Sequence, residues 1–238
     1  MYEQAVREVD TVFNKRVKVK YRKDTNDYDV INSVMISDEY LAHTIPYKNG
    51  DHFIDLGAHI GTWSVLMASM NPTFTVHAYE PIPENFELLR ENITINGLDN
   101  IKAYQLAVHP HPTLWKYINI FYTYDATPFG KIHKFVGSDS GMGQSIEVKT
   151  ISLDNILDDM DKCKVIKSDC EGCEAKSFEW VCEENLNKID YIIGEFHTRG
   201  HMDFDWFAEL LKPKFIDLSE SYYSIEGGNL RRFIFRRI

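Results

Sequence analysis

Apolar positions along the chain follow two different periods. From about residue 50 onward, short apolar runs typical of buried strands alternate with stretches whose apolar residues recur at helical spacing. In residues 84–96, for example, Phe86, Leu89 and Ile93 fall on one helical face. Strands that alternate with helices predict an α/β fold, with a mainly parallel sheet and helices on both faces.

The pattern predicts the position of each element. We expect strands at 52–56, 74–80, 101–108, 164–169, 190–196, 214–220 and 230–237, and helices at 62–70, 84–96, 152–160, 175–182 and 204–211. Two more strands, at 114–124 and 144–151, flank a polar loop from Asp125 to Gly143, which is long enough for a lid or a binding loop. Residues 1–48 predict a strand pair, or a strand and a short helix, which we interpret as a cap on a domain spanning residues 49–238.

Polar residues follow the ends of five predicted strands. In a sheet of this kind, ligands bind beyond the carboxyl ends of the strands, where the strand order reverses. We therefore expect these residues to converge on one site. They are Asp55 to Gly61, Glu80 and Pro81, Gln105 to Val108, Asp169 to Gly172, and Glu195 to His197.

The segment FIDLGAHIGTW, residues 53–63, predicts a strand, a tight glycine turn and the start of a helix, which brings backbone N–H groups close to a ligand. Glu80 follows Asp55 by 25 residues and suits a ribose, because one carboxylate accepts from both hydroxyls. A dinucleotide fold would need G-x-G-x-x-G, whereas only Gly57 and Gly61 are present. Asp55 suits a cationic amine better than a pyrophosphate. The pattern favours S-adenosylmethionine over NAD, and a tight turn with a helix-capping acid is the structural alternative.

Four successive segments resemble the motifs of the FkbM-type S-adenosylmethionine-dependent methyltransferases: FIDLGAHIGTWS, AYEPIPENFELLRENITINGL, IKSDCEGCE and IIGEFH. The resemblance covers the chain from about Asp29 to its C-terminus. It implies a Rossmann-like class I methyltransferase fold, with a mainly parallel seven-stranded sheet and an antiparallel last strand. The chain departs from the family pattern at His59, where Asn is usual, and at Cys170, where Val or Ile is usual.

The resemblance also implies a cofactor site for S-adenosylmethionine, with S-adenosylhomocysteine as product. The turn after the first strand would line the methionine end, Glu80 would hold the ribose, and the end of the third strand would face the adenine. The implied cofactor-binding residues are Asp55, Gly57, Ala58, His59, Gly61, Thr62, Glu80, Pro81, Gln105, Leu106, Ala107 and Asp169.

Four residues are candidates for catalysis. Asp169 and Glu171 are two apart, and Glu195 and His197 repeat that spacing on the next strand. Crowded carboxylates raise at least one pKa, which produces a base near neutrality. We hypothesise that Asp169 or His197 is the general base and that Glu171 orients it. A divalent cation held by Asp169, Glu171 and Glu195 is an alternative that the chemistry does not require. A helix cap at Glu171 and a hydrogen-bonded strand-end His197 are the structural alternatives.

Composition narrows the class of protein further. The 26 basic and 36 acidic residues give a net charge of −10, which argues against broad binding to nucleic acid. The basic stretch from Lys15 to Lys23 predicts an amphipathic strand with its charged face in water. The N-terminus has no signal-peptide pattern and no apolar run is long enough to span a membrane, which predicts a cytoplasmic protein.

The four cysteines are Cys163, Cys170, Cys173 and Cys182. Cys170 and Cys173 have zinc-like spacing, but a second close pair is missing, so we expect no metal there. Free thiols are the expected state, which agrees with a reducing compartment.

These patterns predict an enzyme that methylates a hydroxyl group on a small molecule. The family resemblance indicates a sugar, a lipid or a secondary metabolite as the acceptor. Three alternatives remain open: a ribose 2′-O-methyltransferase acting on nucleic acid, for which Lys167 is the candidate lysine; a non-catalytic module that binds S-adenosylmethionine; and an NAD-dependent oxidoreductase. The sequence does not predict the oligomeric state.

Overall fold

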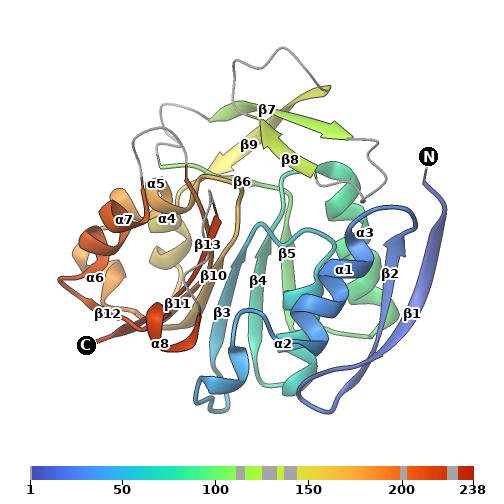
Figure 1. Ribbon diagram of the computed structural model, residues 1–238, viewed down its shortest axis with the longest axis horizontal. Helices are drawn as coiled ribbons and strands as arrows, with labels where there is room; N and C mark the ends of the chain where they lie inside the picture. Colours follow the sequence, from blue (N-terminus) through green and yellow to red (C-terminus); the bar gives the residue numbers. More distant parts are fainter. Residues whose placement is uncertain (1, 111–115, 125–132, 137–143, 199–202, 224–229) are drawn as a thin grey trace.

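The computed structural model describes residues 2–110, 116–124, 133–136, 144–198, 203–223 and 230–238 (Figure 1). Its main element is a seven-stranded sheet in which β13 runs in the opposite direction to the other six strands. The pairs among β11, β10, β3, β4 and β5 are all parallel. This arrangement confirms the predicted fold class. In sheet order, the strands are β12 (Phe215–Asp217), β13 (Leu230–Arg237), β11 (Ile189–His197), β10 (Cys163–Ser168), β3 (His52–Leu56), β4 (Thr75–Tyr79) and β5 (Ile101–Tyr104).

Helices cover both faces of this sheet because successive strand residues point to opposite sides. On β3, Phe53 packs toward α2 (Thr62–Met70), with its ring centroid 6.3 Å from that of Trp63, whereas Ile54 and Leu56 belong to the core on the other face. The first face also carries α3 (Pro83–Ile95). The second face packs against α4 (Leu153–Asp158), α5 (Glu174–Glu179), α6 (Glu183–Leu186) and α7 (Phe204–Leu211), and the short α8 (Ser219–Tyr222) precedes β13.

The N-terminal segment shares a core with the first face. β1 (Gln4–Asp10) and β2 (Arg16–Arg22) form an antiparallel hairpin, and they are followed by α1 (Asp27–Ile31), the π-helical turn η1 (Asn32–Ile36) and the 3₁₀ turn η2 (Ala42–Thr44). The hairpin is amphipathic as predicted at Val17, Lys18 and Val19, of which only Lys18 is exposed. The prediction is wrong at Arg22, which is buried and paired with Asp27. Val17 and Val19 join the same hydrophobic cluster as Phe53 and Trp63, so residues 2–48 close one side of the domain.

A second, smaller sheet lies over one end of the first (Figure 1). Its strands, in order, are β6 (Ala107–Val108), β9 (Gln144–Ile151), β7 (Tyr117–Tyr124) and β8 (His133–Val136). The strand predicted at 101–108 is therefore two strands in two different sheets. The predicted loop from Asp125 to Gly143 contains β8 and otherwise lies outside the described residues. No helix in the described parts of the chain is long and apolar enough to cross a membrane.

Two of the cysteines are bonded to each other. Cys170 and Cys173 form a disulfide, whereas Cys163 is free and buried and Cys182 is free and exposed. The prediction of free thiols is therefore wrong for this pair. The loop reverses direction because Glu171 and Gly172 both have positive φ, at 59° and 105°, and this brings the two Cα atoms to 5.6 Å, within disulfide range. A reducing compartment no longer follows from the cysteines.

Candidate active site

A cavity of about 390 Å³ lies between the two sheets, at the carboxyl ends of β3, β4 and β10. This size is within the range of about 300–1,000 Å³ that is usual for small-molecule sites. The walls come from several parts of the chain that are far apart in sequence. They include Gly57 to His59, Tyr79 to Ile82, Leu106 to Pro110, Ile118 and Ile120 of β7, Asp169 to Cys173, and Asn26, Val30, Val34 and Tyr40 of the N-terminal segment.

Most of the predicted cofactor residues line this cavity, namely Gly57, Ala58, His59, Thr62, Glu80, Pro81, Leu106, Ala107 and Asp169. Three do not belong to its described wall. Gln105 is exposed, and Asp55 is fully buried within β3. Gly61 lies beside Leu89 of α3 and has a φ of 88°, in the left-handed region that favours glycine, so the backbone of the turn accounts for this residue.

Glu80 presents a fixed carboxylate at the cavity. Its oxygens accept hydrogen bonds from the backbone N–H groups of His59 (2.8 Å) and Ile82 (2.9 Å) and from the Asn85 side chain (3.3 Å). Burial raises the pKa of this carboxyl, and the three hydrogen bonds act in the opposite direction. The carboxylate therefore joins the turn after β3 to the start of α3 and holds both around one side of the cavity.

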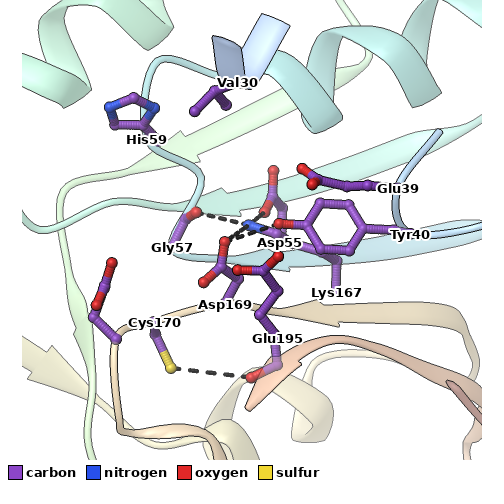
Figure 2. A network of polar contacts seen from close by, with 12 residues as sticks. Val30, Glu39, Tyr40, Asp55, Gly57, His59, Lys167, Asp169, Cys170 and Glu195 are labelled. Carbon is purple, nitrogen blue, oxygen red and sulfur yellow. Dashed lines mark hydrogen bonds and ion pairs between the residues drawn. The ribbon is translucent and has the colours of Figure 1, made fainter. Parts of the chain in front are cut away.

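Lys167, which the sequence analysis named only as the candidate lysine of a ribose methyltransferase, lines the cavity. Its ammonium donates to the Gly57 carbonyl at 2.8 Å and lies 3.1 Å from Asp55 Oδ1 and 3.9 Å from Asp169 Oδ2 (Figure 2). Burial lowers the pKa of Lys167, but the nearby carboxylates outweigh that effect and the pKa is raised. Asp55 also accepts a hydrogen bond from Ser64 at 2.6 Å. The charge of Asp55 is thus compensated inside the protein, which removes the argument that it awaits a cationic amine.

His59 connects the same turn to the N-terminal segment. Arg22 donates to Asp27 at 2.9 and 2.8 Å, and its guanidinium lies 3.1 Å from His59 Nε2. Both charged side chains are almost fully buried. Burial lowers the pKa of His59 to about 4, so the imidazole is neutral. The departure from the family pattern at His59 therefore provides a neutral contact with a buried ion pair.

The four candidate catalytic residues gather near one another, but only Asp169 and Glu171 line the described cavity. Asp169 accepts a hydrogen bond from the Tyr40 hydroxyl at 2.8 Å. Figure 2 shows the Asp169 and Glu195 carboxylates close together beside the Tyr40 ring. Tyr40 was not predicted from the sequence, because nothing in the N-terminal segment marks it as a partner of a residue 129 positions away.

Glu195 and His197 are not part of the described cavity wall, and both interact with charged neighbours. Arg232 donates to Glu195 at 3.1 Å and to Glu39 at 3.2 Å. Burial raises the pKa of Glu195 to about 7, and the charges of Asp169 and Glu39 act in the same direction.

His197 is surrounded by carboxylates. Its Nδ1 atom lies 3.1 Å from Glu174 Oε1, and its Nε2 atom lies 3.6 Å from Glu171 Oε2. Burial lowers the pKa of His197, but the Glu174 hydrogen bond and the carboxylates raise it to about 9. His197 is therefore protonated at neutral pH and cannot accept a further proton.

Three of these residues, Asp169, Glu195 and His197, are close enough to bind a metal ion together. Ligand-type atoms of Asp169, Glu195 and His197 lie within 4.8 Å of one another, so these three side chains could hold a divalent ion. His197 takes the place of Glu171 in the predicted set. Lys167 and Arg232 already supply positive charge to Asp169 and Glu195.

The strand order, the antiparallel β13 and the cavity at the strand ends are those of the class I methyltransferase fold. Residues 55–223 match the family model described as the methyltransferase FkbM domain. The chain belongs to the FkbM methyltransferase family.

The chain is also similar to individual proteins. The chain is 23% identical over 185 residues to the 31-O-demethyl-FK506 methyltransferase FkbM of Streptomyces tacrolimicus, a match that covers 66% of this chain and 70% of the relative. Among solved structures, the putative methyltransferase yhhF of Escherichia coli superposes with a TM-score of 0.51 at 8% identity and covers 98% of each chain. The precorrin-6y C5,15-methyltransferase of Geobacter metallireducens has a TM-score of 0.48 at 11% identity and covers 92% and 93% of the two chains.

Proposed function

We propose that this protein transfers the methyl group of S-adenosylmethionine to a hydroxyl group of a small molecule, such as a sugar, a lipid or a secondary metabolite. The observation that carries the proposal is the presence of Glu80, the Gly57–Ala58 turn and Asp169 on the wall of one cavity. The similarity to the 31-O-demethyl-FK506 methyltransferase of Streptomyces tacrolimicus supports an oxygen atom as the acceptor.

Glu80 is suited to bind the ribose of the cofactor. Its carboxylate is held by three donors at the cavity edge, and a fixed carboxylate can accept hydrogen bonds from two neighbouring hydroxyls. The Lys167 ammonium donates a hydrogen bond to the Gly57 carbonyl and so fixes the turn after β3. The chain therefore offers a preorganised surface, so that binding does not require the turn to be ordered first.

Asp169 is the residue that we assign as the general base. S-adenosylmethionine supplies an electrophilic methyl group, so the protein has to position the acceptor hydroxyl and remove its proton. Asp169 lines the cavity, whereas His197 is already protonated at neutral pH. The Tyr40 hydroxyl, 2.8 Å from Asp169 Oδ2, fixes the direction of the carboxylate. Tyr40 is thus a positioning residue. Glu171 lies two residues after Asp169, in the loop between β10 and α5, and also lines the cavity.

The test is transfer of labelled methyl from S-adenosylmethionine to a panel of hydroxyl-bearing small molecules. Asp169→Asn should abolish transfer and change the affinity for S-adenosylhomocysteine only a few-fold, because the base acts on the acceptor. Glu184→Gln, an exposed acid on α6, is the matched control and should keep full turnover. Unchanged turnover in Asp169→Asn would refute the assignment of the base.

The alternatives make different predictions. A ribose 2′-O-methyltransferase would label RNA and not the small molecules, but the net charge of −10 and the pairing of Lys167 with Asp55 do not favour it. A module without turnover would bind the cofactor and label nothing. A cytoplasmic location, expected from the sequence, stays a prediction.

A further inference from the structure

The Cys170–Cys173 disulfide is part of the cavity wall. It closes the loop between β10 and α5, and both cysteines line the cavity. Each of the two residues is partly exposed. Neither of the free cysteines, buried Cys163 and exposed Cys182, belongs to the described wall.

The loop closed by this disulfide has an unfavourable backbone. Glu171 has a φ of 59°, in the left-handed region that non-glycine residues avoid, and Gly172 follows at 105°. The Glu174 carboxylate accepts hydrogen bonds at 2.9 Å from the backbone N–H groups of Cys170 and Gly172. The disulfide and this carboxylate together keep the loop in its turn.

The loop also packs directly against the glycine turn at the other wall of the cavity. A Cβ at Gly57, which has a φ of 74°, would lie 2.0 Å from the Asp169 carbonyl oxygen and 3.3 Å from Cys170 Cα. The two backbones are therefore in contact with no space between them. A shift of residues 169–170 toward this turn would have to move Gly57 and Ala58 as well.

We propose that Cys170 and Cys173 form a redox site whose state sets how tightly the cavity binds the cofactor, with a small or protein dithiol as the reductant. Two electrons and two protons pass from the dithiol to the disulfide, the Cys170–Cys173 bond breaks, both cysteines become thiols and the dithiol becomes a disulfide. Sulfur atoms bonded at about 2.0 Å must then separate toward the contact distance of about 3.5–4 Å. At least one side chain moves within the wall beside Asp169, and the turn at Glu171 is then held by the Glu174 carboxylate alone. The oxidised form is therefore the preorganised one.

This inference rests on the proposed function for its ligand, S-adenosylhomocysteine. The experiment prepares the full chain in oxidised and in reduced dithiothreitol, counts free thiols by alkylation and mass spectrometry, and titrates each form with S-adenosylhomocysteine. We expect two free thiols in the oxidised form and four in the reduced form. We expect reduction to weaken the affinity by about fivefold or more, because the loop then has to be ordered on binding.

Variants separate this site from the other cysteines. The double variant Cys170→Ser, Cys173→Ser should bind with the affinity of the reduced wild type in both buffers. Cys182→Ser, at an exposed free thiol, should respond to dithiothreitol as the wild type does.

Three results would count against the proposal. Four free thiols in the oxidising buffer would show that no disulfide forms. Equal affinity in the two forms would overturn the control of binding while leaving the proposed function intact. Absence of binding in both forms would refute the proposed cofactor and with it the link to binding, and the thiol count would still decide whether the redox site exists.

Discussion

The Lys167 ammonium lies 3.1 Å from the Asp55 carboxylate, and the two side chains are 5% and 0% exposed. The same ammonium donates to the Gly57 carbonyl at 2.8 Å. A buried charge without a partner is costly, whereas a buried pair with further hydrogen bonds is tolerated. The ion pair therefore joins β10 to β3, and the hydrogen bond to Gly57 joins β10 to the turn after β3.

Replacing Lys167 should lower the stability of the protein, because it leaves the Asp55 charge without its partner. Lys167→Met leaves Asp55 charged and buried without its counter-ion, so we expect the free energy of unfolding to fall by about 3–5 kcal/mol. Urea denaturation measures it. Lys162→Met, at an exposed lysine before β10, is the control and should change stability by less than about 0.5 kcal/mol. A loss below about 1 kcal/mol for Lys167→Met would show that the pair is not effectively buried.

The contact between the N-terminal segment and the turn depends on Asp27. In Asp27→Ala, buried Arg22 loses the carboxylate of Asp27, and neutral His59 cannot replace that charge. We expect a loss of about 3 kcal/mol in unfolding free energy. Asp29→Ala, at an exposed position of the same helix, should have little effect. Equal unfolding midpoints for the two variants would contradict the structural role of the ion pair.

His197 predicts a dependence of stability on pH. Its pKa is raised from 6.5 to about 9 in the folded protein, so the folded state favours the protonated imidazole. Its contribution is fully present below pH 6.5 and is lost as the pH rises through 9, with a limit of about 3 kcal/mol. His197→Gln should flatten the decline in unfolding free energy over this range. A wild-type curve that rises with pH between 6.5 and 9 would contradict the sign.

Removal of divalent ions should leave methyl transfer and cofactor binding unchanged. Lys167 and Arg232 already place positive charge beside Asp169 and Glu195, so the cluster does not need a metal to balance its charge. Dialysis against a chelator, followed by the labelled-methyl assay, tests this. Loss of activity that added Mg²⁺ restores would instead show that a divalent ion is required, with Asp169, Glu195 and His197 as its candidate ligands.

The order of strands and helices could be predicted from the sequence because it follows from local periodicity. β3 and α2 have the same bounds in the sequence pattern and in the structure. The break between β5 and β6 could not be predicted, because β6 pairs with β9, about forty positions further along the chain, and short apolar runs carry no sign of their partners.

Site residues that directly follow a strand could be predicted from the sequence. Site residues that depend on a side-chain contact between distant segments could not. Glu80 and Asp169 follow strand ends and line the cavity. Asp55 occupies the expected position, but its pairing with Lys167 depends on the contact between β3 and β10. The position of Lys167, two residues before Asp169, was the one signal for it. Tyr40 and Arg232 reach the site from remote segments.

The central claim is that the cavity binds S-adenosylmethionine through Glu80. Calorimetric titration with S-adenosylhomocysteine tests it most directly, with Glu80→Gln, the exposed control Glu87→Gln, and NAD as a second ligand. We predict micromolar binding that Glu80→Gln weakens by about tenfold or more, equivalent to about 1.4 kcal/mol, no effect of Glu87→Gln, and no binding of NAD. Absence of binding, or equal affinity in Glu80→Gln and the wild type, would contradict the account.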